Sequence, residues 1–110
     1  MAIEEIEPQE LAERLRRGEK IRLIDVRQPW EHEIATLAGG ELVPLDQLAY
    51  GGADVEQEGA EPVVVYCHHG VRSLAGVSFL QRMGWTGEIR SLAGGIERWS
   101  LQIDPAVPRY

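Results

Sequence analysis

The segment VVVYCHHGVRS, residues 63–73, carries most of the information about the fold. Its first part, 63–66, is an apolar, β-branched run without alternation, which predicts a central strand of a parallel sheet buried on both faces. From Ser73 to Met83 the apolar residues recur at helical spacing, and Gly84 ends the pattern. A buried strand that passes through a short loop into a helix indicates an α/β domain.

Shorter segments on both sides of this unit continue the alternation. The pattern predicts strands at 3–6, 21–26, 42–43 and 89–92, a helix at 8–17, a helical turn at 30–33 and a last helix that begins at Ile96. The stretch 50–62, which holds three glycines and several acidic residues, is expected to be an exposed loop with at most one helical turn. Strands and helices joined by such short connections predict a layered α/β domain with a mainly parallel sheet.

Composition and charge limit the classes of function. With 110 residues, 44% hydrophobic and 26% charged, the chain is expected to form one domain, residues 1–110. It has no apolar run near 18 residues and an acidic start, so we expect no membrane span, no leader and a cytoplasmic location. The net charge of -7 argues against nucleic-acid binding. A single cysteine excludes an intrachain disulfide and a thiolate-rich metal cage.

Cys67 is the candidate reactive residue. It follows the central strand directly, at the edge of the sheet where α/β domains bind ligands. Gly70 permits a tight curl whose backbone N–H groups, together with the dipole of the following helix, favour negative charge at the centre of the loop. These features favour the thiolate form of Cys67, which is the nucleophilic form. Arg72 adds a planar guanidinium suited to an oxyanion.

Each candidate also has a plain structural interpretation. A lone cysteine at a strand end is often a small buried hydrophobe. His68 and His69 suggest a metal site with Cys67, but adjacent side chains rarely converge on one ion, so both histidines are expected to face solvent. No metal or other cofactor is predicted. His32 is expected on a helix surface, and the three tryptophans in packing positions: Trp30, Trp85 and Trp99.

Three pieces of the chain resemble the three motifs of the rhodanese family. They are IDVRQPWEHEIATLAGGELVPL (24–45), VVVYCHHGVRS (63–73) and SLAGGIERW (91–99), and the most specific element is C-x-x-G-x-R-S at 67–73. The resemblance implies a three-layer α/β domain with a five-stranded, mainly parallel sheet. It also implies sulfurtransferase activity through a persulfide on Cys67, and a structural pair formed by Asp25 and Arg27.

Two further stretches bear on the resemblance: one departs from the family pattern, and the other adds a similarity. Where many family members have Gly-His-Ile-Pro-Gly-Ala, this chain has the residues of 35–40, Ala-Thr-Leu-Ala-Gly-Gly, without the histidine and proline. The segment DPAVPRY, 104–110, is similar to the end of rhodanese modules fused to adenylating enzymes that serve ubiquitin-like sulfur carriers. That similarity implies a sulfur-carrier protein, or a persulfide-donating protein, as a partner.

The leading hypothesis is a sulfurtransferase in which Cys67 attacks the outer sulfur of thiosulfate or of a donor persulfide and passes it to a thiophilic acceptor. Substrate binding is assigned to the rest of the loop and its rim: His68, His69, Gly70, Val71, Arg72 and Ser73. Arg72 is expected to hold an anionic donor, and Ser73 to cap the helix.

Two other hypotheses remain open. One is a non-catalytic binding module of the same fold. The other is a cysteine-dependent phosphatase, which separates its Cys and Arg by five residues to surround a phosphoryl group. Here four residues separate Cys67 from Arg72, and the shorter loop fits a sulfur atom better.

Overall fold

A five-stranded sheet in the order β1-β5-β4-β2-β3 forms the centre of the computed structural model, which describes residues 3–110. All four neighbouring pairs are parallel. The strands are β1 (Glu5–Ile6), β2 (Arg22–Asp25), β3 (Glu41–Leu42), β4 (Val63–Tyr66) and β5 (Ile89–Leu92). The helices are α1 (Pro8–Arg16), α2 (Pro29–Ile34), α3 (Leu45–Ala49), α4 (Arg72–Arg82) and α5 (Gly95–Gln102).

The central strand β4 is buried on both faces, as its sequence predicts. Val63 and Val65 belong to a hydrophobic cluster that includes side chains of α3 and α4. Val64 and Tyr66 point the other way, into a second cluster with side chains of α1 and α5. Because a strand alternates its side chains between two faces, a run of four apolar residues requires a cover on each side.

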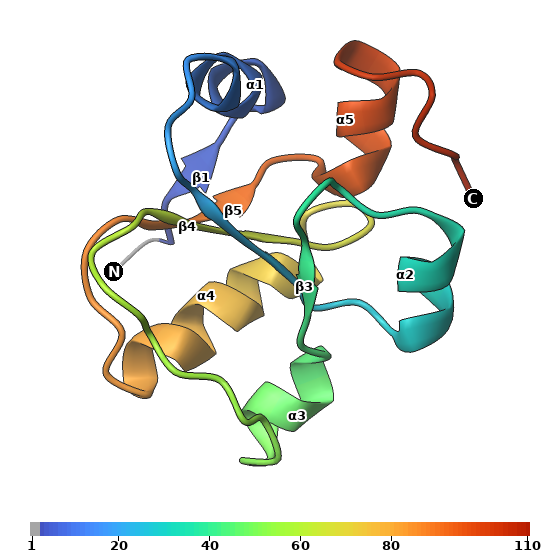
Figure 1. Cartoon of the computed structure of the whole chain (residues 1–110). Helices are drawn as coiled ribbons and strands as arrows, with labels where there is room; N and C mark the ends of the chain where they lie inside the picture. The colour runs from blue at the N-terminus through green and yellow to red at the C-terminus, as the bar shows by residue number, and fades with distance from the viewer. Residues whose placement is uncertain (1–2) are drawn as a thin grey trace.

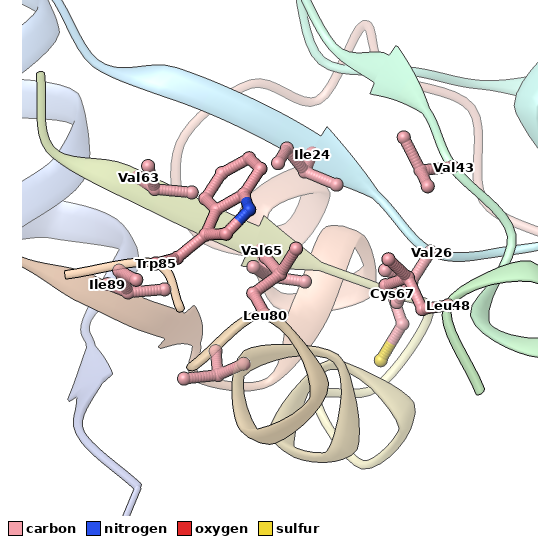
Figure 2. Packing of buried hydrophobic residues seen from close by; sticks show 11 residues of the cluster. Ile24, Val26, Val43, Leu48, Val63, Val65, Cys67, Leu80, Trp85 and Ile89 are labelled. Carbon is pink, nitrogen blue, oxygen red and sulfur yellow. The ribbon is translucent and has the colours of Figure 1, made fainter. Parts of the chain in front are cut away.

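Helices therefore cover the sheet in two outer layers, which confirms the predicted three-layer α/β architecture. Helices α3 and α4 pack together on one face, and α1 and α5 on the other (Figure 1). In the first cluster, Trp85 and Ile89 lie at one end and Cys67 lies beside Val26 and Leu48 at the other (Figure 2). Cys67, the candidate reactive residue, thus lies in the hydrophobic core.

The predicted elements are present with shifted boundaries. The stretch 50–62 is a mostly exposed loop, as predicted. The short helix α3 before it was not predicted, and it buries Leu48 against the sheet. The α4 helix begins at Arg72 rather than Ser73. No helix in residues 3–110 is long and apolar enough to cross a membrane.

The segment 35–40, which departs from the family pattern, is held by the hydroxyl of Tyr66. This hydroxyl contacts Thr36 Oγ1 at 2.9 Å and accepts a hydrogen bond from the amide of Leu37 at 3.3 Å. A Cβ atom on Gly40 would lie 2.3 Å from the same hydroxyl oxygen, so the absence of a side chain there makes the contact possible. In this chain the segment is thus held by contacts to a buried tyrosine of β4.

Candidate active site at Cys67

Cys67 is the first residue after β4, and its side chain is buried. Its Sγ atom accepts hydrogen bonds from the backbone amides of Gly70 at 3.1 Å and Ser73 at 3.3 Å. The chain reaches this arrangement because Gly70 adopts a φ of 94°, which residues with a side chain rarely adopt. The amide of Ser73 belongs to the first turn of α4, where helix amides have no partner within the helix. Both donors stabilise negative charge on the sulfur.

The other side of the loop rests on the start of α5. The amides of Ile96 and Glu97 donate to the carbonyl oxygens of Cys67 at 2.9 Å and His68 at 3.1 Å. Gly95, with a φ of 63°, lies directly against these carbonyl groups. Two helix N-termini therefore fix the loop: α4 by donating to the sulfur and α5 by donating to the carbonyls. In Figure 1 the loop passes between α4, α5 and α2.

The predicted capping role of Ser73 is wrong. The helix α4 has no side-chain cap, and Val71 occupies the capping position. The hydroxyl of Ser73 instead lies 2.7 Å from the hydroxyl of Ser91 in β5 and accepts from the thiol of Cys67 at 3.4 Å. Both serines are fully buried, and the hydrogen bond between their hydroxyl groups gives each of them a partner. Ser91 did not stand out in the sequence, because a serine in a strand carries no signal of its own.

Arg72 is engaged by a carboxylate. Its two terminal nitrogens donate to the two oxygens of Glu31, at 3.1 and 3.0 Å. Burial is the largest single effect and disfavours the charge of Arg72, but the hydrogen bonds to Glu31, its charge and the nearby Cys67 and Tyr110 together raise the pKa of the guanidinium. Glu31 is itself 5% exposed. Glu31, to which the sequence pattern gives no role, thus forms a bidentate pair with the arginine expected to bind substrate.

Asp25 and Arg27 form an ion pair in which both side chains are fully buried. The amide and Nε of Arg27 donate to Asp25 Oδ1 at 3.0 and 2.8 Å, and Nη2 donates to Oδ2 at 2.8 Å. His32 Nδ1 lies 2.8 Å from the same Oδ2 atom. The prediction of His32 as a helix-surface residue holds only in part, since its side chain is 27% exposed but one ring nitrogen contacts the buried carboxylate.

Tyr110 joins the two ion pairs. Its hydroxyl accepts a hydrogen bond from Arg27 at 2.7 Å and donates one to Glu31 at 3.2 Å. The ring stacks on His68 at 4.0 Å between centroids, and His69 stacks on the opposite face of His68 at 3.9 Å. Trp30 packs edge-on against Tyr110 at 6.0 Å.

The expectation that both histidines face solvent is correct for His69 and wrong for His68. Nε2 of His68 is buried and has no hydrogen-bond partner among the described residues. Burial, followed by the proximity of His69, lowers the pKa of His68. His68 therefore contributes little positive charge to the rim of the loop. Val71, between the loop and α4, is largely exposed.

The family profile described as "Rhodanese-like domain" matches residues 7–102, a range that contains the whole loop at Cys67. The chain belongs to the rhodanese-like domain family. The match covers every element except β1, so the resemblance seen in the three motifs extends over nearly the whole fold.

Relatives of this rhodanese-like domain include large and small proteins. The chain is 33% identical over 105 residues to the "Probable adenylyltransferase/sulfurtransferase MoeZ" of Mycobacterium tuberculosis, covering 96% of this chain and 26% of that protein. It is 28% identical to a "Sulfurtransferase" of Allochromatium vinosum, covering 96% of this chain and 95% of that protein. The structure of a human single-domain sulfurtransferase matches with a TM-score of 0.72 and 26% identity, covering 89% of this chain and 96% of that one. The chain thus spans about a quarter of MoeZ.

Proposed function

We propose that this rhodanese-like domain is a sulfurtransferase that carries sulfane sulfur as a persulfide on Cys67. The observation that carries the proposal is the pair of backbone amides, from Gly70 and Ser73, that donate to Sγ of Cys67. Two such donors stabilise a thiolate before the reaction and an anionic sulfur after it. The names of the small relatives support the same activity.

The reaction takes place in two halves. The thiolate of Cys67 attacks the outer sulfur of thiosulfate or of a persulfide, a new S–S bond forms, and the bond to sulfite or to the donor thiolate breaks. In the second half, a nucleophilic acceptor attacks the outer sulfur of the Cys67 persulfide, and the thiolate of Cys67 leaves. Neither half requires a metal or an organic cofactor.

We further propose a ubiquitin-like sulfur-carrier protein as the acceptor. The name of MoeZ gives that protein both an adenylyltransferase and a sulfurtransferase activity. The alignment with MoeZ covers 96% of the present chain. A cytoplasmic location also fits the proposal, because a reducing compartment keeps a lone thiol free for the reaction.

The two alternative functions lack support in the site. A phosphatase loop needs room and free cations around a phosphoryl group. Here Cys67 is buried and Arg72 is bound to Glu31. A docking module has no need of a thiol that receives two amide hydrogen bonds.

Intact mass spectrometry tests the proposal directly. The wild-type protein is incubated with thiosulfate or with a small-molecule persulfide, and the mass should rise by one sulfur atom that cyanide or a thiol reductant removes. The Cys67→Ala variant, folded by circular dichroism, should gain no mass, because the chain has no second cysteine. A mass gain in that variant, or none in the wild type with either donor, would overturn the proposal. Adding an adenylated carrier to the loaded protein then tests the acceptor, since the sulfur should leave Cys67.

A further inference from the structure

The positive charges around the loop at Cys67 are all paired with carboxylates in the described part of the chain. Arg27 pairs with Asp25 and Arg72 with Glu31. On the outer side, Arg109 pairs with Glu97, which lies close enough to His68 to affect its pKa. His68 adds little charge, because burial lowers its pKa. The region that receives the sulfur donor therefore has little net positive charge.

Two residues, Arg72 and Tyr110, donate the hydrogen bonds that hold Glu31 in position. Arg72 donates to both of its oxygens, and the hydroxyl of Tyr110 donates to Oε2 at 3.2 Å. That hydroxyl also accepts from Arg27, which polarises it toward the carboxylate. Because the side chain of Glu31 is 6% exposed and that of Arg72 is 35% exposed, solvent screens this pair only in part.

A dianionic donor and Glu31 compete for the same guanidinium. Glu31 already occupies the Nη1/Nη2 edge of Arg72. Thiosulfate must therefore displace the carboxylate from that edge or bind the remaining Nε–H edge beside it, and in either case the carboxylate repels it. A persulfide without carboxylates needs no cation for binding. It needs the amides of the loop, which remain directed at Sγ of Cys67.

We propose that Glu31 is a specificity-determining residue that makes the site select low-charge persulfide donors over the thiosulfate dianion. The proposal rests on the sulfurtransferase function given above and names its donor class. The loading step is Cys67–S⁻ + R–S–S–H → Cys67–S–S–H + R–S⁻. The bond between the two donor sulfurs breaks, a bond to Cys67 forms, and the leaving thiolate takes a proton from water, so no oxidant or reductant is consumed.

The test compares two donors in three proteins. The donors are thiosulfate and the persulfide of N-acetylcysteine amide, which has no carboxylate. The proteins are the wild type, Glu31→Gln and Glu33→Gln. Glu33 is a matched control, because it lies on the same helix α2 but is exposed and pairs with no cation in the described part of the chain.

In the wild type, kcat/KM should be at least about a hundredfold higher for the persulfide. Glu31→Gln should raise kcat/KM for thiosulfate by about tenfold or more, the range of a charged hydrogen bond, and change that for the persulfide by less than about threefold. Glu33→Gln should leave the ratio of the two values unchanged. The ratio of the two kcat/KM values in the wild type can be measured without any variant. A poorly folded Glu31→Gln protein therefore does not prevent the test.

The outcomes separate this inference from the proposed function. If neither donor adds sulfur to Cys67 in the wild type, the sulfurtransferase proposal fails. If the persulfide loads Cys67 but thiosulfate loads it as efficiently, the role of Glu31 is overturned and the sulfurtransferase stands. The same holds if Glu31→Gln leaves the ratio unchanged, or if Glu33→Gln shifts it equally.

Discussion

Gly95 lies so close to Cys67 that a Cβ atom on Gly95 would be 2.5 Å from the carbonyl oxygen of Cys67. The contact joins the N-terminus of α5 to the loop that carries the thiol, and it allows the amide of Ile96 to reach the same carbonyl. The shape of the loop thus depends on a residue 28 positions later in the sequence.

Gly95→Ala should both destabilise the fold and displace the loop. The left-handed backbone of this residue and the steric overlap each cost about 1–3 kcal/mol. At about 4–8 °C per kcal/mol for a domain of roughly this size, Tm should fall by about 8 °C or more. Alkylation of the buried Cys67 should also become faster. Thermal denaturation and the rate of iodoacetamide labelling measure the two effects.

Gly84→Ala is the control for that prediction. Gly84 has a φ of 101°, but no atom lies within 4 Å of the position of its Cβ, so this variant should show the backbone cost without the overlap. Equal losses of Tm in the two variants, with unchanged labelling of Cys67, would contradict the role given to Gly95.

Asp25→Asn should be among the most destabilising polar substitutions. It leaves Arg27 charged and fully buried without its counter-ion, and breaking such a pair typically costs about 3–5 kcal/mol. Glu41→Gln is the matched control, because it breaks the pair of Arg22 with Glu41, whose side chain is 47% exposed, and should cost about 1 kcal/mol or less. Urea denaturation gives both values, and similar losses in the two variants would show that Arg27 finds another partner.

The stability of the fold should decrease as the pH falls below about 6.5, the usual pKa of histidine. Burial, followed by the nearby His69, lowers the pKa of His68 in the folded chain. The unfolded chain therefore binds a proton at a higher pH than the folded chain, and stability is lost as the pH falls toward the folded pKa. The carboxylates whose pKa values are lowered by arginines, Glu19, Glu88 and Glu97, act in the same direction but below about 4.5.

His68→Asn isolates this effect. Between pH 7 and 5 the free energy of unfolding of the wild type should fall more steeply than that of the variant. Denaturant titrations at several pH values measure both free energies. Parallel curves would mean that His68 does not titrate differently in the folded and unfolded chains.

The local pattern predicted the sheet well, because burial on two faces leaves a direct mark on the sequence. The strand predicted at 63–66 is central, and the strand predicted at 89–92 is present and pairs with it. The position of α3 was missed, because five residues are too few to show a helical period.

The site was less predictable, since its defining contacts are distant in the sequence. Cys67 and Arg72 are separated by four residues and share a motif, so the loop could be located. The partner of Arg72 is Glu31, 41 positions away, and the residue that joins the ion pairs is Tyr110, 79 positions from Glu31. Neither residue type is unusual, so nothing in the local sequence marks either position. Contacts of this kind depend on how α2 and the segment after α5 meet, which local patterns do not encode.

Arg72→Ala provides a last prediction, which concerns the charge that remains when this guanidinium is removed. The variant leaves the carboxylate of Glu31 beside the loop without its main counter-ion. Because that charge repels a dianion and the bidentate fork is lost, kcat/KM for thiosulfate should fall by about tenfold or more, through KM. Arg72→Lys should recover part of the loss, since an ammonium supplies the charge but not the fork. The double variant Glu31→Gln, Arg72→Ala should be more active with thiosulfate than Arg72→Ala alone, because it removes the unpaired charge as well. Steady-state kinetics of the four proteins decide the matter: if the double variant is no better than Arg72→Ala, the carboxylate of Glu31 does not act on the donor.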